Sequence, residues 1–307
     1  MNKFFFICYL LILPLSALSQ IENSYWFFGR NAGLNFNTQN GEPEVLNTSR
    51  INTLEGTSSV ADSNGNLLFY TDGITVYNAD HNMMQNGYDL AGGRSSSHSA
   101  LIIPKPGSDH IYYIFTADEM ENLYSWLRFH KGINYSIIDM RKNNGKGAVI
   151  NKNINLYSNS TEKLAAVKNT SDGTIWVITH DFGSDKFAVY KVTDDGVQTD
   201  PVISRTGRTH NAQRETAVGR IGVSPDGTEL AVTVPYHNGS FSDGDVELFD
   251  FDPNTGEVSN ARSLDPGFPV FSAAYSPDGS KLYISGENSL YQYETDMCTI
   301  DDIKNSR

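Results

Sequence analysis

The chain has 307 residues, of which 39% are hydrophobic and only 19% are charged. Acidic residues outnumber basic residues by 36 to 23, which gives a net charge of −13. Because a surface this acidic repels phosphate backbones, the charge excludes nucleic-acid binding through a broad basic surface. The hydrophobic fraction is too low for a multi-span membrane protein and too high for a disordered acidic tail.

Residues 1–19 have the features of a secretory signal peptide. A lysine near the start precedes an apolar run over 4–15, and small residues suited to cleavage follow at 17–19. We therefore expect export through a Sec-type signal to the periplasm, the outer surface or the medium, with no transmembrane segment after cleavage. Removal of Cys8 leaves Cys298 as the only thiol, so no intramolecular disulfide is expected.

The rest of the chain carries a repeat. Short apolar and aromatic runs alternate with Gly, Asn, Asp and Pro, a pattern that predicts strands and tight turns. The clearest copies, 221–234 and 274–285, each place Ser-Pro-Asp-Gly between two strand-like runs. Turns centred on 64, 109, 172, 226 and 278 are spaced by 45, 63, 54 and 52 residues, a mean of 53.5. Such a period predicts an all-β protein, a β-propeller of four-stranded antiparallel blades, with a linear solenoid as the alternative.

The repeats divide a single domain, residues 20–307, into a partial blade and five further copies. Their boundaries are expected near 25–49, 55–92, 98–152, 162–205, 215–265 and 271–297. The partial blade has three strand-like runs and is interpreted as lacking an innermost strand, which in many rings comes from the C-terminal end of the chain. We find no such closing strand in the sequence and expect an incomplete ring of about five to six repeats.

Several stretches of sequence are similar to those of a known family. They are Trp26–Gly29, Ala32–Phe36, Glu55-Gly56, Gly65–Gly73, Ser99–Ile102, Pro104–Ser108, Tyr135–Met140, Glu162–Leu164, Trp176–His180, Ser224–Gly227, Val246–Asp250 and Leu290–Tyr293. The chain resembles the N-terminal β-propeller of secreted gliding-motility-associated and PKD-domain proteins of Bacteroidetes, which are cargo of type IX secretion. The resemblance implies a seven-bladed parent fold and a secreted or cell-surface adhesion protein, and it implies no established activity. The family's next repeat and its C-terminal sorting domain have no counterpart here, so a truncated relative is expected.

A polar residue recurs just before each innermost strand. These residues are Glu55, His98, Glu162 and Glu215, which precede their turns by 9, 11, 10 and 11 residues. Equivalent positions of a propeller face the same rim of the central channel, so we expect the four side chains to converge. The hypothesis is a carboxylate-rich ring that binds a cation or a polar ligand. The alternative is that each residue only hydrogen-bonds the neighbouring blade.

The long spacing in the third repeat contains an insertion, residues 118–132, which is expected on the same face. It carries Tyr124, Trp126, Phe129 and His130 beside two glutamates. Exposed aromatic rings near acids suit stacking on sugar rings or peptide groups. Alternatively, Leu123, Trp126 and Leu127 form one apolar face that packs the insertion down.

No strong catalytic motif is present, and no cofactor is expected. The segments 243–245 and 194–196 could supply oxygen ligands to Ca²⁺, but ordinary turn chemistry is the favoured explanation of their aspartates. The histidines show no spacing typical of metal ligands. The sequence therefore favours a secreted, non-enzymatic interaction module for a glycan or a surface protein. The alternatives are an extracellular polysaccharide hydrolase or lyase that uses channel-mouth carboxylates, and an inert remnant of a larger surface protein.

Overall fold

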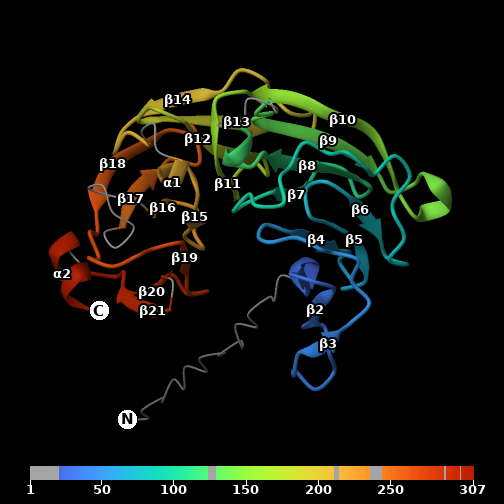
Figure 1. Ribbon diagram of the computed structural model, residues 1–307, viewed down its shortest axis with the longest axis horizontal. Coiled ribbons are helices and arrows are strands. Elements are labelled where there is room, and N and C mark those ends of the chain that lie inside the picture. The colour runs from blue at the N-terminus through green and yellow to red at the C-terminus, as the bar shows by residue number, and fades with distance from the viewer. Residues whose placement is uncertain (1–20, 124–128, 211–213, 236–243, 287, 298) are drawn as a thin grey trace, which may run out of the picture.

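The computed structural model describes residues 21–123, 129–210, 214–235, 244–286, 288–297 and 299–307. Within these residues the chain forms six antiparallel sheets that follow one another around an arc (Figure 1). Sheet 1 contains β1 (Tyr25–Phe28), β2 (Ala32–Asn35) and β3 (Glu44–Leu46). Sheet 2 contains β4 (Ser58–Ala61), β5 (Leu67–Thr71) and β6 (Val76–Asn78). Sheets 1 and 2 thus have three strands each.

The three central sheets have four strands each, and the last sheet has three. Sheet 3 contains β7 (Ala100–Pro104), β8 (Ile111–Ala117), β9 (Ile133–Asp139) and β10 (Ala148–Tyr157). Sheet 4 contains β11 (Ser160–Lys168), β12 (Ile175–Asp181), β13 (Lys186–Val192) and β14 (Val202–Arg205). Sheet 5 contains β15 (Ile221–Val223), β16 (Glu229–Val234), β17 (Asp245–Phe251) and β18 (Val258–Ser263). Sheet 6 contains β19 (Ser272–Tyr275), β20 (Lys281–Ser285) and β21 (Leu290–Glu294).

Among the described residues, helical structure is limited to short segments before, within, between and after the sheets. They are η1 (Ile21–Asn23), η2 (Met120–Asn122), η3 (Asn143–Gly145), α1 (Arg214–Ala217) and α2 (Ile300–Asn305). The sequence did not predict α2, which begins at the N-cap Thr299 and buries Ile303 in the core of sheet 6. None of the described helices is long and apolar enough to cross a membrane. The expected signal peptide, residues 1–19, lies outside the described residues.

Asx-type turns set the spacing of the hairpins. In the turn between β15 and β16, Gly227 has a φ of +73°, which is a conformation that glycine adopts without strain. The Asp226 carboxylate accepts hydrogen bonds from the Thr228 amide at 3.1 Å and from the Ser224 hydroxyl at 2.6 Å. Asp278 repeats this arrangement in sheet 6. Each repeated turn therefore fixes the register of its two strands.

The core is a series of apolar layers, one between each pair of successive sheets. The layer between sheets 4 and 5, for example, contains Phe187 at 0% and Phe249 at 1% exposure, with ring centroids 5.0 Å apart. The other four layers join sheets 1 and 2, 2 and 3, 3 and 4, and 5 and 6. Alternating strand residues point to opposite faces, so most sheets bury both of their faces. This packing confirms the predicted class, an all-β propeller of antiparallel blades.

The innermost strands line the centre of the arc. β4, β7, β11, β15 and β19 contact one another in that order. β1 contacts β4 in the same way, and the Thr57 hydroxyl donates to the Phe27 carbonyl at 2.6 Å. β1 therefore takes the inner place in sheet 1, where the sequence suggested that a strand was lacking. Sheets 1 and 6 form the two ends of the arc (Figure 1).

Candidate functional site

The predicted polar residues lie in the innermost strands or in the segments just before them. Glu162, in β11, is 0% exposed, and its two carboxylate oxygens accept three hydrogen bonds. Oε2 accepts from the amide and the hydroxyl of Ser97, each at 2.7 Å, and Oε1 accepts from the Met120 amide at 2.8 Å. A carboxylate of sheet 4 thus fastens the segment before β7 and the start of the insertion.

Ser97 continues this connection across the centre of the arc. Its hydroxyl oxygen accepts a hydrogen bond from the Gly219 amide at 2.9 Å, and its carbonyl accepts from Arg220 Nε at 3.3 Å. Four segments, which contain Ser97, Met120, Glu162 and Gly219, therefore meet although they are far apart in sequence. We call this arrangement the central clasp. Its bonds fit the alternative that the sequence left open, namely contacts between neighbouring blades.

Burial decides the protonation of the Glu162 carboxyl. It raises the pKa of Glu162 to about 7, against the effect of the donors on Ser97 and Met120. The neighbouring Glu55 carboxylate adds to the rise. Burial also lowers the pKa of Arg220, and the negative charge of Glu55 opposes that change. The structure thus brings Glu55 and Glu162 into one electrostatic group and adds Arg220, which sequence reasoning missed.

His98 belongs to the same group but has the opposite tendency. Burial of its ring and the positive charge of Arg220 lower the pKa of His98 to about 3, so the imidazole is neutral at pH 7. Its Nδ1 has no hydrogen-bond partner among the described residues. The described residues contain no group of three His, Cys, Asp or Glu side chains that could hold a metal ion. The group of polar residues around Glu162 thus differs from the carboxylate-rich ring that the sequence suggested, because it contains the neutral imidazole of His98 and the guanidinium of Arg220.

Glu215, the fourth predicted residue, lies in α1, and its side chain is outside the described part of the chain. The side chain of Lys163, the residue after Glu162, instead reaches the end of α1. The fully buried Lys163 ammonium donates to the carbonyls of Thr216 at 2.8 Å and Val218 at 2.6 Å. Burial lowers the pKa of Lys163 to about 7, while Glu162 and Glu247 oppose the change. The adjacent Glu162-Lys163 pair therefore serves two different segments at the centre.

A second buried polar group lies between sheets 4 and 5. The rings of His180 and His210, each 1% exposed, stack with their centroids 3.7 Å apart. Burial lowers the pKa of His180 to about 3, and His180 Nδ1 lies 2.8 Å from the Asp181 carbonyl. Burial also raises the pKa of Glu247 to about 7. Nothing in the sequence pointed to the pairing of His180 with His210.

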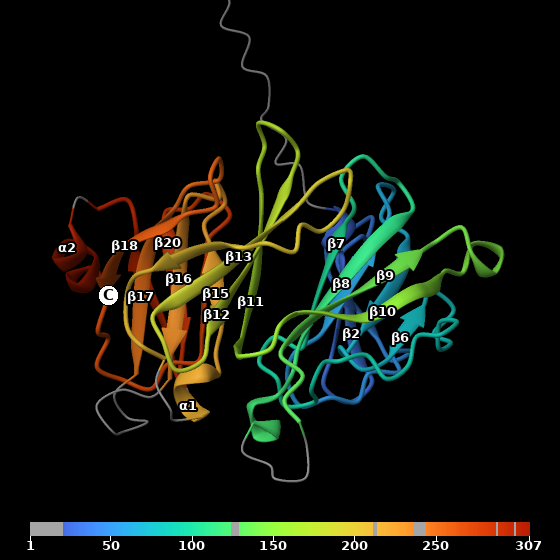
Figure 2. The same cartoon turned by 90° about the horizontal axis from the view of Figure 1, so that it is seen from above.

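The insertion of sheet 3 begins and ends on a buried carboxylate. Asp118, at 0% exposure, accepts from Asn122 Nδ2 at 2.8 Å and from the Lys131 amide at 2.7 Å. Of the four predicted ligand-binding residues, Phe129 is 95% exposed, whereas His130 is partly buried with Nδ1 3.3 Å from the Ser158 carbonyl. Tyr124 and Trp126 lie outside the described residues. η2 and α1 lie at the same end of the sheets (Figure 2).

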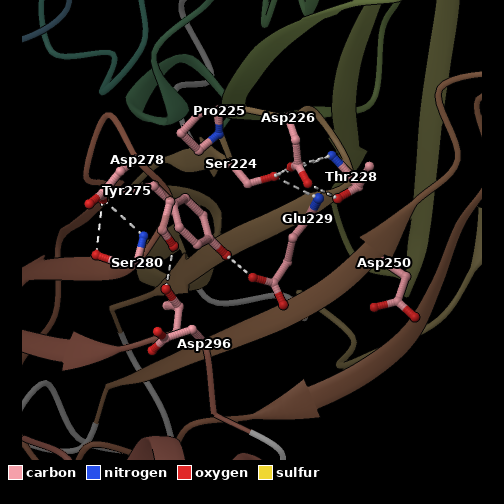
Figure 3. Close-up of a pocket in the computed structure, with 12 residues that line it drawn as sticks. Ser224, Pro225, Asp226, Thr228, Glu229, Asp250, Tyr275, Asp278, Ser280 and Asp296 are labelled. Carbon is pink, nitrogen blue, oxygen red and sulfur yellow. Dashed lines mark hydrogen bonds between the residues drawn. The ribbon is translucent and has the colours of Figure 1, made fainter. Parts of the chain in front are cut away.

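Two large pockets are described, one far from the central clasp and one bordered by Arg220, which bonds to the clasp. One, of about 510 Å³, lies between the turns of sheets 5 and 6 (Figure 3). Its lining includes Asp226, Glu229 and Asp278, and the Tyr275 hydroxyl donates to Glu229 Oε2 at 2.8 Å. The other pocket, of about 480 Å³, follows β1 and β4 and is bordered by Arg220. Neither pocket contains Glu162, and the sequence predicted neither.

Where the structure describes the two segments that could bind Ca²⁺, their residues make hydrogen bonds within the protein. Asp245 is 0% exposed, receives Arg208 Nε at 2.7 Å and the Ser263 hydroxyl at 2.8 Å, and begins β17. Asp243 lies outside the described residues. In the other segment, the Asp195 amide donates to the Thr193 hydroxyl at 3.2 Å, and Gly196 has positive φ. These contacts are those of a turn.

Comparison with known proteins gives similarity of structure alone. No protein-family model and no curated protein matches the chain. A candidate 6-phosphogluconolactonase of Bacteroides fragilis is similar with a TM-score of 0.49 and 13% identity, over 89% of this chain and 76% of that one. A quinoprotein alcohol dehydrogenase-like protein of Bacteroides thetaiotaomicron gives 0.45 and 10%, over 92% and 63%. The β-propeller domain of Cps50 (Swd1) from Myceliophteria thermophila gives 0.45 and 11%, over 89% and 83%. At these identities and TM-scores the similarities say nothing about activity.

Proposed function

We propose that the chain is a non-enzymatic binding module that acts outside the cell or on its surface, with a glycan or another surface protein as its ligand. The observation that carries the proposal is the complete burial of Glu162, with three hydrogen-bond donors on its two oxygens. A general acid or base must reach the proton that it transfers. A carboxylate enclosed by Ser97 and Met120 is instead suited to holding loops in place.

The insertion is the best candidate for the contact with a ligand. Asp118 anchors both of its ends, while the ring of Phe129 is 95% exposed. An exposed aromatic ring on an anchored segment offers a face for stacking on a sugar ring or a peptide group at a low cost in side-chain entropy. The net charge of −13 favours neutral ligands over polyanions.

Affinity electrophoresis of the purified chain in gels that contain mannan, xyloglucan or dextran tests binding to neutral glycans. Binding of the fluorescently labelled chain to whole cells of its host tests for a surface protein. In the assay that detects binding of the wild-type chain, Phe129→Ala should weaken binding by about fivefold or more, which corresponds to about 1 kcal/mol. Ile203→Ala, which changes an exposed apolar residue on β14, is the matched control and should bind normally. Binding that is absent from both assays, or equal in the two variants, would contradict the proposal.

A second candidate function is hydrolysis or elimination of an extracellular polysaccharide. It is favoured by the electrostatic coupling of Glu55 and Glu162 and by the raised Glu162 pKa of about 7, because a carboxyl group with a raised pKa beside a second carboxyl group suits general acid catalysis. Release of reducing or unsaturated ends from the same polysaccharides, lost in Glu55→Gln, would support it. A chain that binds a polysaccharide and leaves it intact would favour the binding module.

The resemblance to gliding-motility-associated propellers supports export and a surface location. Fractionation of the host, followed by sequencing of the protein's N-terminus, tests this part of the proposal. A chain that begins at Gln20 and is found on the surface or in the medium is expected, and a cytoplasmic chain that retains residues 1–19 would overturn it. The remaining alternative, an inert remnant, predicts early melting and aggregation without binding in either assay.

A further inference from the structure

Arg220 supplies the only charged side chain among the described residues that line the pocket of about 480 Å³. It immediately precedes β15, whereas the other lining residues lie in or beside β1 and β4. The pocket therefore lies between the inner strands of sheets 1 and 2 and the start of sheet 5. Its volume is within the range of small-molecule sites, about 300–1,000 Å³.

The positive charge of Arg220 has no ion-pair partner among the described residues. Its Nε donates to the Ser97 carbonyl at 3.3 Å, and no described residue accepts a hydrogen bond from Nη1 or Nη2. The charge of Glu55 favours the protonated guanidinium, but burial opposes it more strongly and lowers the pKa of Arg220. A buried guanidinium is stabilised by a carboxylate that pairs with it. The unused Nη atoms therefore indicate a place for a ligand carboxylate.

The inner edge of β1 adds two amide donors to the same pocket. The Phe27 carbonyl accepts from the Thr57 hydroxyl at 2.6 Å, and the Tyr25 carbonyl accepts from the Ser59 hydroxyl. In an antiparallel strand the amide and the carbonyl of one residue lie on the same edge. The amides of Tyr25 and Phe27 therefore face β4 as well, and all four of these residues line the pocket. Like the guanidinium, these amides are donors that suit an anion.

The hydroxyl groups of the pocket favour a ligand that carries hydroxyl groups of its own. Thr57 and Ser59 donate their hydrogens to β1, so their oxygens can only accept from a ligand. Ser58 Oγ accepts from the Ile102 amide at 3.2 Å and keeps its own hydrogen for donation. The pocket thus offers hydroxyl acceptors and a hydroxyl donor beside β1, and a cation at Arg220.

We propose that this pocket binds a small hydroxycarboxylate, such as a hexuronate, with its carboxylate toward Arg220 and its hydroxyl groups toward β4. The ligand carries a single negative charge, because the chain has a net charge of −13 and the charge of Glu55 also acts at Arg220. At physiological salt, charges farther away than about 8 Å repel such a ligand only weakly. The pocket and the insertion are separate, so this inference does not rest on the proposed function.

Isothermal titration calorimetry of the purified chain with D-galacturonate, D-galactose and acetate tests the site. Galactose lacks the carboxylate, and acetate lacks the hydroxyl groups. Galacturonate is expected to bind at least about tenfold more tightly than either of the other two compounds. No binding of galacturonate up to about 10 mM, or equal binding of galactose or acetate, would overturn the proposal.

Arg220→Gln tests the charge, because glutamine can still donate to the Ser97 carbonyl. It should weaken galacturonate binding by about tenfold or more. Arg205→Gln, at an exposed arginine on β14, is the matched control and should bind normally. Unchanged binding by a folded Arg220→Gln chain would overturn the proposal.

Asn23→Asp keeps the test decisive if Arg220→Gln does not fold. Asn23 is an exposed residue of the pocket, so the new negative charge should weaken galacturonate binding by about threefold or more without unfolding the chain. Asn40→Asp, at an exposed residue outside the pocket, is its control. Phe129→Ala should leave galacturonate binding unchanged, because Phe129 lies in the insertion. Equal binding by the two aspartate variants, or a loss in Phe129→Ala, would contradict this position of the site.

Discussion

Removal of the Glu162 side chain tests whether the central clasp stabilises the fold. Glu162→Ala leaves three buried donors, on Ser97 and Met120, without their acceptor, and it also removes the buried Cγ methylene group. At about 1 kcal/mol for each lost partner and about 0.8 kcal/mol for the methylene, the expected loss is about 4 kcal/mol of unfolding free energy. For a chain of this length that loss lowers the Tm by about 6–7 °C.

The size of this loss should depend on pH. Because the folded-state pKa of Glu162 is raised to about 7 from 4.5, its carboxyl contributes most to stability when protonated, and this contribution falls as pH rises from 4.5 through 7. The destabilisation by Glu162→Ala should therefore be larger at pH 5 than at pH 8, by up to about 3 kcal/mol. Urea unfolding followed by tryptophan fluorescence at both pH values measures this difference.

Glu119→Ala is the control for position and charge. Glu119 is a partly exposed glutamate beside the clasp, and its carboxylate accepts a hydrogen bond from the Ser95 amide at 3.1 Å. Its removal should cost no more than about 1 kcal/mol. A loss below about 1 kcal/mol for Glu162→Ala, or a loss that grows as pH rises, would refute the reasoning about the clasp.

Two further changes test other parts of the centre. The folded-state pKa of His180 is lowered to about 3 from 6.5, so between these pH values the unfolded chain binds a proton that the folded chain does not bind. Stability should therefore fall as pH drops from 6.5 to 3. His180→Phe should flatten this part of a stability curve measured by urea unfolding, and an unchanged slope would contradict the assignment. Gly56→Ala places a Cβ 2.3 Å from the Ser99 amide nitrogen and 2.8 Å from the Ser96 carbonyl. It should lower stability by about 3 kcal/mol in a thermal melt and speed hydrogen exchange in the segment before β7, whereas wild-type exchange would argue against close packing there.

The repeated turns and alternating strands were predictable because they depend on neighbours in sequence. The pair Asp226-Gly227 forms its turn through contacts within five residues, so a single repeat carries the whole signal. α2 escaped prediction because its helix is only six residues long and is held by the burial of Ile303 against sheet 6. Equal spacing also indicated that Glu55 and Glu162 share one end of the sheets, but it could not show which of their atoms are solvent-exposed.

The sequence by itself determined a chain of short antiparallel sheets, since alternation and tight turns act locally. Only the tertiary structure decided what the polar residues do. Glu162 became a buried acceptor because Ser97 and Met120, which are 65 and 42 residues away in sequence, present their donors to it. Likewise, the sequence predicted that Phe27 and Trp26 belong to one strand. Only the position of sheet 2 shows that Phe27 is buried and that Trp26 is exposed. Burial and charge pairing depend on distant segments, which a local pattern does not encode.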